Sequence, residues 1–349
     1  MGINPRLISV IIPTRNEEKF IASCLDSIIL NIESSLTLEI LVVDGMSEDR
    51  TQDIVRDFSK KYPFVRLLIN ENRTVPFAMN SGIENSFGDV IVRIDAHAIY
   101  PTNYIKKLVD SLDELGADNV GGLWITVPGN DTLSAKAIAL ILSNSFGVGN
   151  ALYRTGVAIT QEVDTVPFGC YRRDVFERIG LYDEMLTRNQ DCELNARLKR
   201  HGGKIILIPD VKITYFAREN FSKMFRMLFQ YGYFKPLVNI KIGKITTWRQ
   251  LVPPVFVSTI LLTSLGGFIF HELWSILAIV LITYLLANIL VSISITMKRG
   301  GVLFPFLVFG FFIAHLSYGA GYIKGLINFI FFKEHTKHKN KKNVMSITR

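Results

Sequence analysis

The sequence has few cysteines and lacks several other signals that would define its class. Its three cysteines, Cys24, Cys170 and Cys192, are far apart and show no metal-binding spacing. We interpret them as reduced, buried thiols of a cytosolic domain. No internal repeat is visible, and no aromatic-rich RNA-binding signature accompanies the basic residues, so we expect no nucleic-acid partner. The N-terminus leads directly into a predicted strand, so we expect no cleavable signal peptide.

Charge is also scarce in one part of the chain, residues 252–332, which are almost uncharged. The whole sequence is 49% hydrophobic with a mean hydropathy of +0.28, which is high for a soluble protein. This pattern predicts a soluble domain followed by a membrane domain. The predicted parts are a cytosolic catalytic domain at 1–220, an amphipathic interfacial segment at 221–250, transmembrane helices at 251–332 and a basic tail at 333–349.

The uncharged region contains two clear predicted spans, Val252–Phe270 and Leu273 to about Thr296. The next apolar stretch, Val302–Phe332, is longer than the roughly 20 residues that one crossing needs. We favour three spans in total, although a third span with an interfacial helix or a re-entrant pair fits the same length. The net charge of +8 is concentrated around these segments, as the positive-inside rule expects of a multi-pass protein of the cell membrane with a cytoplasmic catalytic domain.

Two features of this C-terminal part have alternative interpretations. Residues 221–240 mix Phe, Met and Leu with Lys and Arg, which favours an interfacial helix over an ordinary helix packed on the catalytic domain. His315 lies within the last apolar stretch, where an ionisable group is often functional. We favour a helix-packing hydrogen bond with Ser317 or Tyr318.

The first 210 residues alternate short apolar strands with helical stretches, which is typical of an α/β fold. The strands are rich in Val and Ile along their whole length, as in sheets that are covered on both faces. We therefore predict a doubly wound, mainly parallel sheet. We expect Ser47 to cap the second helix. The predicted strands are Leu7–Pro13, Leu38–Asp44, Phe64–Asn70, Val90–Asp95, Val120–Val127 and Lys204–Ile208, and the predicted helices are 17–31, 49–61, 76–86, 102–115 and 190–201.

Polar side chains follow three of these strands, at the edge where ligands bind in an open α/β sheet. Pro13-Thr14-Arg15-Asn16-Glu17-Glu18 closes the first strand, and Asp44 ends the second. Asp44 is suited to accept hydrogen bonds from a base or ribose, or alternatively to stabilise a turn. Asp95-Ala96-His97 ends the strand that begins at Val90, and it provides two side chains that can grip a divalent cation. A cation there would neutralise a diphosphate, so the pattern predicts an enzyme that handles sugar nucleotides.

These motifs resemble the family 2 inverting glycosyltransferases, which have the GT-A fold. The resemblance continues through much of the chain, where the sequence is similar to the succinoglycan-biosynthesis type of membrane glycosyltransferase. The matching elements are Val10–Glu18, Asp44 with Ser47, Asp49 and Thr51, Ala78-x-Asn80-x-Gly82, Gly88-Asp89, Asp95-Ala96-His97, Phe146–Asn150, Glu162–Thr165, Phe168–Arg173, Asn189–Asn195 and His315–Gly319.

The resemblance implies roles for individual residues. Asp44 would bind the nucleobase or ribose, with Thr14 and Glu17 lining the same pocket. Asp95 and His97 occupy the family's Asp-x-Asp positions, which hold Mg²⁺ or Mn²⁺ on the diphosphate. Because imidazole ligates Mn²⁺ readily whereas Mg²⁺ prefers oxygen, His97 favours Mn²⁺, or a metal held by Asp95 and the phosphates. Alternatively, His97 only bonds the loop. The remaining donor-pocket residues are Pro13, Asn80, Gly169 and Arg172.

Asp191 matches the family's catalytic base, which removes the proton of the acceptor hydroxyl as that hydroxyl attacks the anomeric carbon. The chain carries Gln190 where the family usually has Glu. The alternative for Asp191 is a charge that interacts favourably with the N-terminus of a helix.

The leading hypothesis is a membrane-anchored inverting glycosyltransferase that moves a hexose from a nucleotide-sugar, preferably a UDP-sugar, to a polyprenyl-diphosphate-linked saccharide. Two alternatives are a polyprenyl-phosphate sugar synthase and a catalytically silent membrane partner that binds nucleotide-sugar. The departures at His97 and Gln190 are the only support for the silent partner.

Overall fold

The computed structural model describes residues 6–30 and 36–333. Within this range the chain forms two compact units, and each is described by itself. The first, here called the sheet unit, comprises Met1–Ile125 and Gly156–Tyr215. The second, here called the helical unit, comprises Thr126–Thr155 and Phe216–Arg349. Residues 126–155, which the sequence prediction included in the catalytic domain, thus belong with the C-terminal helices.

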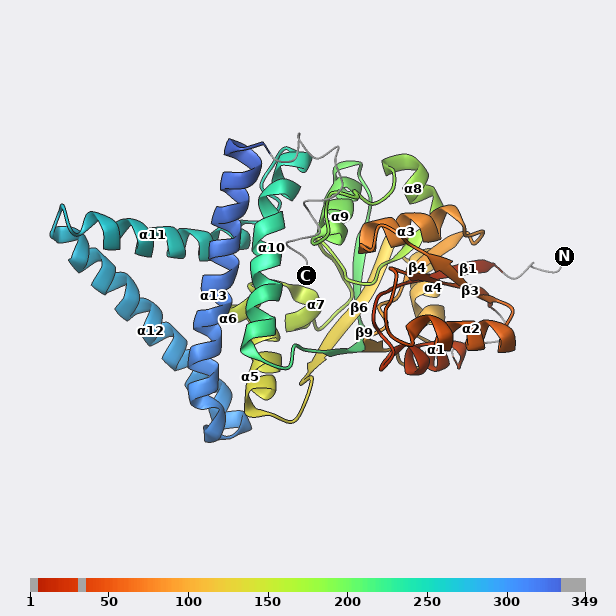
Figure 1. Cartoon of the computed structure of the whole chain (residues 1–349), viewed down its shortest axis with the longest axis horizontal. Helices are drawn as coiled ribbons and strands as arrows, with labels where there is room; N and C mark the ends of the chain where they lie inside the picture. Colours follow the sequence, from red (N-terminus) through yellow and green to blue (C-terminus); the bar gives the residue numbers. More distant parts are fainter. Residues whose placement is uncertain (1–5, 31–35, 334–349) are drawn as a thin grey trace. The chain divides into compact units, whose positions relative to one another are not determined.

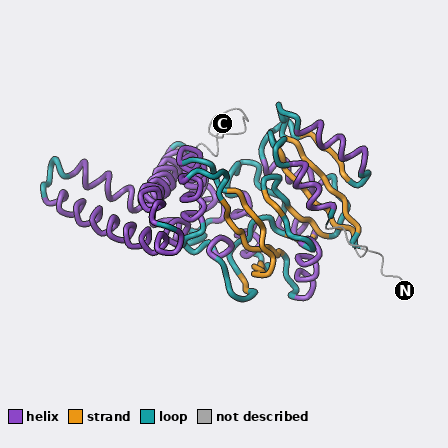
Figure 2. The backbone as a smooth tube through the Cα atoms, turned by 90° about the horizontal axis from the view of Figure 1, so that it is seen from below, coloured by secondary structure: helices purple, strands orange, loops and turns teal. Residues whose placement is uncertain are grey.

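In the described residues, the sheet unit is built on a nine-stranded sheet with the order β3-β2-β1-β4-β8-β6-β9-β5, and β7 pairs with β9. Figure 2 shows the strands as one twisted layer with helices beside it. The strands are β1 (Leu7–Thr14), β2 (Thr37–Asp44), β3 (Val65–Ile69), β4 (Val90–Arg93), β5 (Ala98–Ile99), β6 (Asn119–Val127), β7 (Gln161–Glu162), β8 (Cys170–Arg172) and β9 (Ile205–Phe216).

The strand pairing of the sheet changes from parallel to antiparallel next to β4. The pairs β2–β3, β1–β2 and β1–β4 are parallel, as predicted from their apolar Val- and Ile-rich sequences. The pairs β4–β8 and β6–β8 are antiparallel, so the sheet is mixed rather than mainly parallel. Because β2 and β4 flank β1 on opposite sides, the chain reverses its direction of travel across the sheet here. In open α/β sheets the carboxyl ends of strands at such a switch point form the ligand-binding crevice.

Helices cover both sides of the parallel strands. Figure 1 shows α1 and α2 on one side of β1 and β3, and α3 on the other. Burial of Ile21, Leu25 and Ile28 at helical spacing fixes the inner face of α1. The helices of this unit are α1 (Ile21–Ile29), α2 (Thr51–Lys61), α3 (Val75–Glu84), α4 (Tyr104–Glu114), α8 (Arg173–Ile179) and α9 (Gln190–Arg200).

The predicted strands and helices of this unit all form, with shifted ends. Helix α1 begins at Ile21 rather than residue 17, and β4 ends at Arg93 rather than Asp95. Strand β9 continues well beyond the predicted end at Ile208, and β5, β7 and β8 were not predicted. Cys24 and Cys170 are buried as predicted, and burial raises the pKa of both thiols. Cys192 is only partly buried.

The helical unit contains two long helices that run side by side, α10 (Phe221–Ile242) and α13 (Phe304–Leu326) (Figure 1). Their backbones approach closely where glycines face the other helix. A Cβ at Gly232 would lie 2.1 Å from the Tyr318 carbonyl oxygen, and one at Gly321 would lie 2.1 Å from that of Phe229. The other elements here are α5 (Leu133–Leu142), α6 (Ser145–Val148), α7 (Leu152–Thr155), η1 (Trp248–Leu251), α11 (Val252–Gly266), α12 (Glu272–Arg299), η2 (Gly301–Leu303) and the π-helical η3 (Ile327–Phe331).

Two helices in the described residues are long and apolar enough to cross a membrane, Glu272–Arg299 and Gly301–Phe331. They correspond to the second and third predicted spans. Both expose much of their apolar surface; Leu290 of α12, for example, is 66% exposed. The first predicted span, Val252–Phe270, is wrong in length, because α11 has 15 residues and ends at Gly266. At 1.5 Å per residue this helix spans about 22 Å, less than the roughly 30 Å of a bilayer core. Apart from Lys333, the predicted basic tail lies outside the described residues.

His315 of α13 makes two packing hydrogen bonds within the helical unit. Its Nδ1 lies 2.9 Å from the Tyr284 hydroxyl of α12, and its Nε2 lies 2.7 Å from the Phe146 carbonyl oxygen of α6. The predicted packing role is therefore confirmed, but the predicted partners Ser317 and Tyr318 are wrong. Both ring nitrogens of His315 are already engaged by groups from neighbouring helices, so neither bonds Ser317 or Tyr318 of its own helix.

Candidate active site

The turns after β1 and β2 interlock through their polar side chains. Strand pairing aligns Thr14 with Asp44 at the end of both strands. The Asn16 amide donates to Ser47 Oγ at 2.8 Å, and the Glu17 amide donates to Thr51 Oγ1 at 2.8 Å. In return, the Glu48 amide donates to Asn16 Oδ1 at 2.9 Å. The two motifs that the sequence singled out therefore form one rigid rim of the crevice.

Asp44 is fully buried beneath this rim. Its carboxylate accepts hydrogen bonds from the Ser47 amide at 2.9 Å, from the Gln52 side chain at 2.7 Å and from the Ser47 hydroxyl. The structure thus shows the turn-stabilising role that was the alternative for Asp44, and its predicted base or ribose contact stays a prediction. The prediction that Ser47 caps α2 is wrong, since its hydroxyl is engaged by Asp44.

Thr14 brings a hydroxyl and Glu17 a carboxylate to the carboxyl edge of the sheet. Thr14 is 5% exposed, and its hydroxyl oxygen has no hydrogen-bond partner in the structure. A buried hydroxyl without a partner is unfavourable, so this atom suits a ligand that supplies one. Pro13 lies within the strand beside Val43. The Glu17 carboxylate lies 3.3 Å from His97 Nδ1, which links the turn after β1 to the turn after β4.

The Asp95 carboxylate is held by a buried arginine two residues before it. Arg93 Nε and Nη2 donate to the two carboxylate oxygens of Asp95 at 3.1 and 3.3 Å. The Asp95 amide donates to the Tyr100 hydroxyl at 2.9 Å, which fixes the turn. Burial opposes the charge on Arg93, but the neighbouring Asp95, Tyr182 and Asp191 outweigh it and raise the pKa of the guanidinium.

Asp95 and His97, the proposed metal-binding residues, fit a cation only if the substrate supplies further oxygen atoms. Among residues 6–30 and 36–333, no three His, Cys, Asp or Glu side chains gather as a metal-binding group. Asp95 and His97 are both partly exposed. Asp95 pairs with Arg93 at 3.1 Å, and His97 Nδ1 lies 3.3 Å from the Glu17 carboxylate. Magnesium and manganese sites built from one or two protein ligands plus substrate phosphates are common. The residues therefore fit a cation that is shared with a diphosphate.

Asp191 lies in the first turn of α9, where its charge interacts favourably with the helix dipole. Its Oδ1 accepts from the Cys192 amide at 2.9 Å, and the residue is only partly buried. Gln190 before it is 6% exposed. Asp191 contributes to the raised pKa of Arg93, so the start of α9 lies within electrostatic range of the end of β4.

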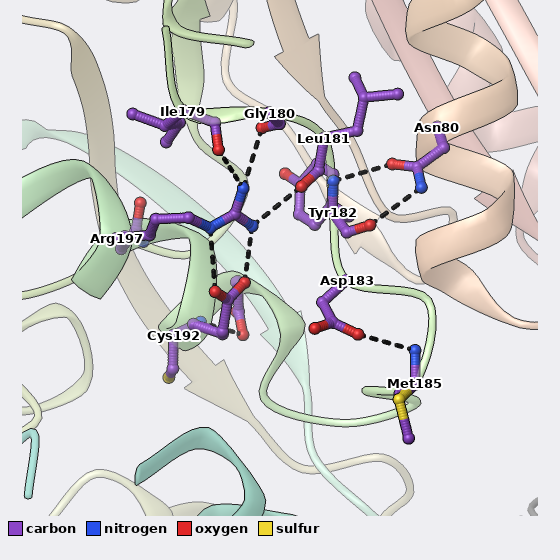
Figure 3. A network of polar contacts seen from close by, with 12 residues as sticks. Asn80, Ile179, Gly180, Leu181, Tyr182, Asp183, Met185, Cys192 and Arg197 are labelled. Atoms are coloured by element: carbon purple, nitrogen blue, oxygen red, sulfur yellow. Dashed lines mark hydrogen bonds and ion pairs between the residues drawn. The ribbon is translucent and has the colours of Figure 1, made fainter. Parts of the chain in front are cut away.

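The loop before α9 is fixed by two side chains, as Figure 3 shows. Asn80 of α3 holds Tyr182, donating to its carbonyl oxygen at 2.9 Å and accepting from its amide at 2.9 Å. Arg197 of α9 donates to the carbonyl oxygens of residues 179–181 and pairs with Glu193 at 2.7 Å. Asn80 was predicted to bind the donor, but in the structure both ends of its side chain hold this loop.

The outcomes for Gly169 and Arg172 differ. The Gly169 carbonyl oxygen accepts from the Arg93 amide at 3.1 Å, so Gly169 borders the site. Arg172 pairs with Val90 at the opposite end of β4 and donates to the Leu112 and Ala117 carbonyl oxygens. The structure does not bring Arg172 together with the other predicted donor-pocket residues, because β8 runs antiparallel to β4 and carries Arg172 away from the carboxyl edge. Its predicted donor contact stays a prediction.

Sequence reasoning missed Arg93 and Arg197. The signal for Arg93 was present, since a charged residue stands in an otherwise apolar run from Val90 to Ile94. Charged residues are almost never buried unless they are paired, so a charge in this run predicts a paired acidic neighbour. Nothing in the sequence distinguished Arg197 from the other basic residues at the C-terminal end of its helix.

Comparisons with known proteins agree with this geometry. The sequence profile described as "Glycosyl transferase family 2" matches residues 9–180. The chain is 30% identical over 249 residues to "Succinoglycan biosynthesis protein ExoA" of Rhizobium meliloti (strain 1021), covering 70% of this chain and 73% of that protein.

A second relative covers nearly the whole chain. It is "Dolichyl N-acetyl-alpha-D-glucosaminyl phosphate 3-beta-D-2,3-diacetamido-2,3-dideoxy-beta-D-glucuronosyltransferase" of Methanococcus voltae, 29% identical over 329 residues, covering 92% of this chain and 97% of that protein. Among solved structures, the mannosyltransferase PcManGT from Pyrobaculum calidifontis, in complex with GDP-Man and Mn²⁺, superposes with a TM-score of 0.54 at 19% identity. The alignment covers 93% of this chain and 88% of that one, and the likeness confirms the predicted GT-A fold.

Proposed function

Because the chain belongs to glycosyl transferase family 2, we propose that it transfers a sugar from a nucleotide-sugar to a lipid-linked saccharide at a membrane. The observation that carries this proposal is the placement of Asp95 against the buried Arg93, with a second carboxylate in electrostatic range. Asp95 follows β4 and pairs with the Arg93 guanidinium at 3.1 Å, and Asp191, in the first turn of α9, contributes to the raised pKa of Arg93. A transferase needs such a pair, one carboxylate for the diphosphate side of the donor and one for the attacking hydroxyl.

In this mechanism the nucleotide lies along the rim formed by the turns after β1 and β2. The Thr14 hydroxyl and the Asp44 carboxylate face the nucleoside, and Thr14 supplies a hydrogen bond that the protein itself leaves unmade. Asp95 and His97 would hold Mn²⁺ or Mg²⁺ together with the donor diphosphate, and the cation would stabilise the charge on that leaving group.

Asp191 acts as the general base. The acceptor oxygen forms a bond to the anomeric carbon while the bond from that carbon to the diphosphate oxygen breaks. The hydroxyl proton passes to Asp191, and the bonding electrons leave with the diphosphate. Because the base and the leaving group lie on opposite faces of the sugar, the transfer inverts the anomeric centre.

The lipid-linked acceptor is supported by the helical unit and by the relatives. Within residues 6–30 and 36–333, two helices are long and apolar enough to cross a bilayer. The name of the Methanococcus relative describes a dolichyl-linked sugar acceptor, and that of the Rhizobium relative describes polysaccharide synthesis. We propose that the helices anchor the protein in the cell membrane with the sheet unit on the cytoplasmic side, where basic residues flank the apolar segments.

The test is sugar transfer by the full-length protein in detergent. Radiolabelled UDP- and GDP-hexoses are incubated with host lipid extract or with bare polyprenyl phosphate, in the presence of Mn²⁺ or Mg²⁺. We expect metal-dependent label in lipid-linked saccharide, reduced about 10²- to 10⁴-fold in Asp191→Asn, the usual contribution of a general base. The matched control is Asp57→Asn, because Asp57 is an exposed carboxylate paired only with Lys60.

Each other outcome has a distinct meaning. Label on bare polyprenyl phosphate would instead identify a polyprenyl-phosphate sugar synthase. Donor binding without transfer to either lipid would identify a silent partner. Full activity in Asp191→Asn would show that Asp191 is not the base.

A further inference from the structure

Arg93 is a cation at the end of a central, buried strand. It is 6% exposed and aligns with Ile11 of β1. Its amide donates to the Gly169 carbonyl oxygen, so its backbone is fixed between the parallel and antiparallel halves of the sheet. A cation in such a place must be paired to be tolerated.

The pairing in the structure is incomplete. Nε and Nη2 of Arg93 donate to Asp95, and the guanidinium carbon lies 5.9 Å from the centre of the Phe168 ring. Nη1 is buried and has no hydrogen-bond partner in the described part of the chain. Buried donors are almost always satisfied in folded proteins, so this nitrogen indicates an acceptor that a ligand brings.

The neighbours of Arg93 indicate which part of the ligand that is. If the proposed function holds, Asp95 lies on the diphosphate side of the donor and Asp191 on the side of the attacking hydroxyl. The group that separates a leaving diphosphate from an attacking hydroxyl is the sugar ring. The sugar ring is bonded directly to the diphosphate. Because Nε and Nη2 of Arg93 are paired with Asp95, the remaining nitrogen Nη1 lies beside the diphosphate side of the donor, where that ring binds.

We infer that Arg93 is a donor-binding residue that recognises the sugar, with Nη1 donating to a ring hydroxyl while Nε and Nη2 hold Asp95. The same side chain thus couples two tasks, orienting the carboxylate that serves the diphosphate and reading the hexose. Lysine cannot replace it, because a single ammonium lacks the planar fork that serves both partners at once.

The test compares two affinities measured on one protein sample. Calorimetry in detergent with Mn²⁺ gives the dissociation constant of the nucleotide-sugar that wild type binds best among UDP-glucose, UDP-galactose, UDP-N-acetylglucosamine and GDP-mannose. A second titration uses the corresponding nucleoside diphosphate. The ratio of the two constants reports on the sugar, and it is insensitive to the fraction of folded protein, which changes only the stoichiometry.

We expect Arg93→Lys and Arg93→Gln to raise the ratio of the two dissociation constants, nucleotide-sugar over nucleoside diphosphate, about tenfold or more, the loss of one charge-assisted hydrogen bond to the sugar. Any loss from a displaced Asp95 weakens both ligands and cancels in this ratio. Arg93→Lys keeps the positive charge beside Asp95 and is the milder change to the fold. The matched control is Arg178→Lys, whose side chain is 42% exposed and paired with Asp118 and Asp174; it should leave both constants unchanged.

Two results would overturn the inference. Equal weakening of both ligands would mean that Arg93 acts only on the diphosphate side, and unchanged binding of both would mean that Nη1 meets no ligand. A wild-type protein that binds no nucleotide of the panel would contradict the proposed function instead, so the two failures are distinguishable.

Discussion

Replacing Asn80 with alanine distinguishes two roles for this residue, holding the loop before α9 and binding the donor. The side chain makes three hydrogen bonds to the loop before α9, two with the Tyr182 backbone at 2.9 Å and one with Glu184 at 3.2 Å. Tyr182 is 3% exposed, so Asn80→Ala leaves a buried amide and a buried carbonyl without partners. Each such group costs about 1–3 kcal/mol. Because both groups belong to one peptide segment that can relax together, we expect a total loss of about 2–3 kcal/mol.

The assay has a structural and a functional part. A loss of this size lowers the melting temperature by roughly 5–10 °C for a domain of this size. Thermal unfolding of the detergent-solubilised protein, followed by circular dichroism, measures it. Because the loop leads into the helix that carries Asp191, we also expect transfer to slow while the affinity for the nucleoside diphosphate stays within about twofold of wild type, as expected when a change adds no new ligand contact.

The matched control is Asn85→Ala at the end of the same helix. Asn85 is exposed and its side chain donates only to the Ser81 carbonyl oxygen at 2.8 Å. We expect it to change stability by less than about 0.5 kcal/mol, as is usual for exposed positions. The reasoning is refuted if Asn80→Ala melts like wild type but binds the nucleoside diphosphate tenfold more weakly. Asn80 would then be a donor ligand, as the family resemblance implied.

Three further predictions concern other parts of the chain. Thr14→Val removes a buried hydroxyl that has no hydrogen-bond partner among the described residues. A thermal shift assay should therefore show unchanged or higher stability of the variant and a smaller stabilisation by nucleoside diphosphate. Lower stability with an unchanged ligand response would contradict this. Slight burial opposes ionisation of Asp49, but hydrogen bonds from Thr51 and the Glu18 amide outweigh it and lower the pKa of that carboxyl. A carboxyl with a lowered folded-state pKa stabilises the protein above its unfolded pKa of about 3.9, so the advantage of wild type over Asp49→Asn in melting temperature should be constant above about pH 5 and shrink as the pH falls below about 4. Gly321→Ala would place a Cβ 2.1 Å from the Phe229 carbonyl oxygen, so it should destabilise the helical unit by about 1–3 kcal/mol in a thermal melt. Gly301→Ala, which meets nothing within 4 Å, should not, and equal melting of the two variants would show that α10 and α13 do not depend on this contact.

The parallel strands and the rim of the site could be predicted because local sequence determines them. Apolar runs of Val and Ile specify buried strands, and polar residues at their ends must lie at the carboxyl edge. Thr14, Asp44 and Asp95 therefore lie at the edge where the sequence placed them. Their precise partners were not predictable, since Ser47 could cap a helix or bond Asp44 with equal local plausibility.

What the sequence could not reveal depends on contacts between distant segments. The three residues of β8 are too few to form a periodic pattern, and their antiparallel pairing with β4 decides that Gly169 borders the site and Arg172 does not. The orientation of the Asn80 amide depends on a loop 102 residues later. Likewise, hydropathy alone marked Val252–Phe270 as apolar, but it could not show that the helix stops at Gly266.

The discontinuous make-up of the two units has a practical consequence for producing the sheet unit without the C-terminal helices. Cutting the chain near residue 216 removes α10 and α13 but leaves α5 behind, since residues 126–155 belong to the helical unit. The buried side chains of α5, including Ile138, Ile141 and Leu142, pack in a cluster with Met224, Leu307 and Phe311 of those lost helices. A simple truncation would therefore expose the apolar face of α5 to solvent and favour aggregation. A water-soluble version should also replace residues 126–155 with a short polar linker between Ile125 and Gly156.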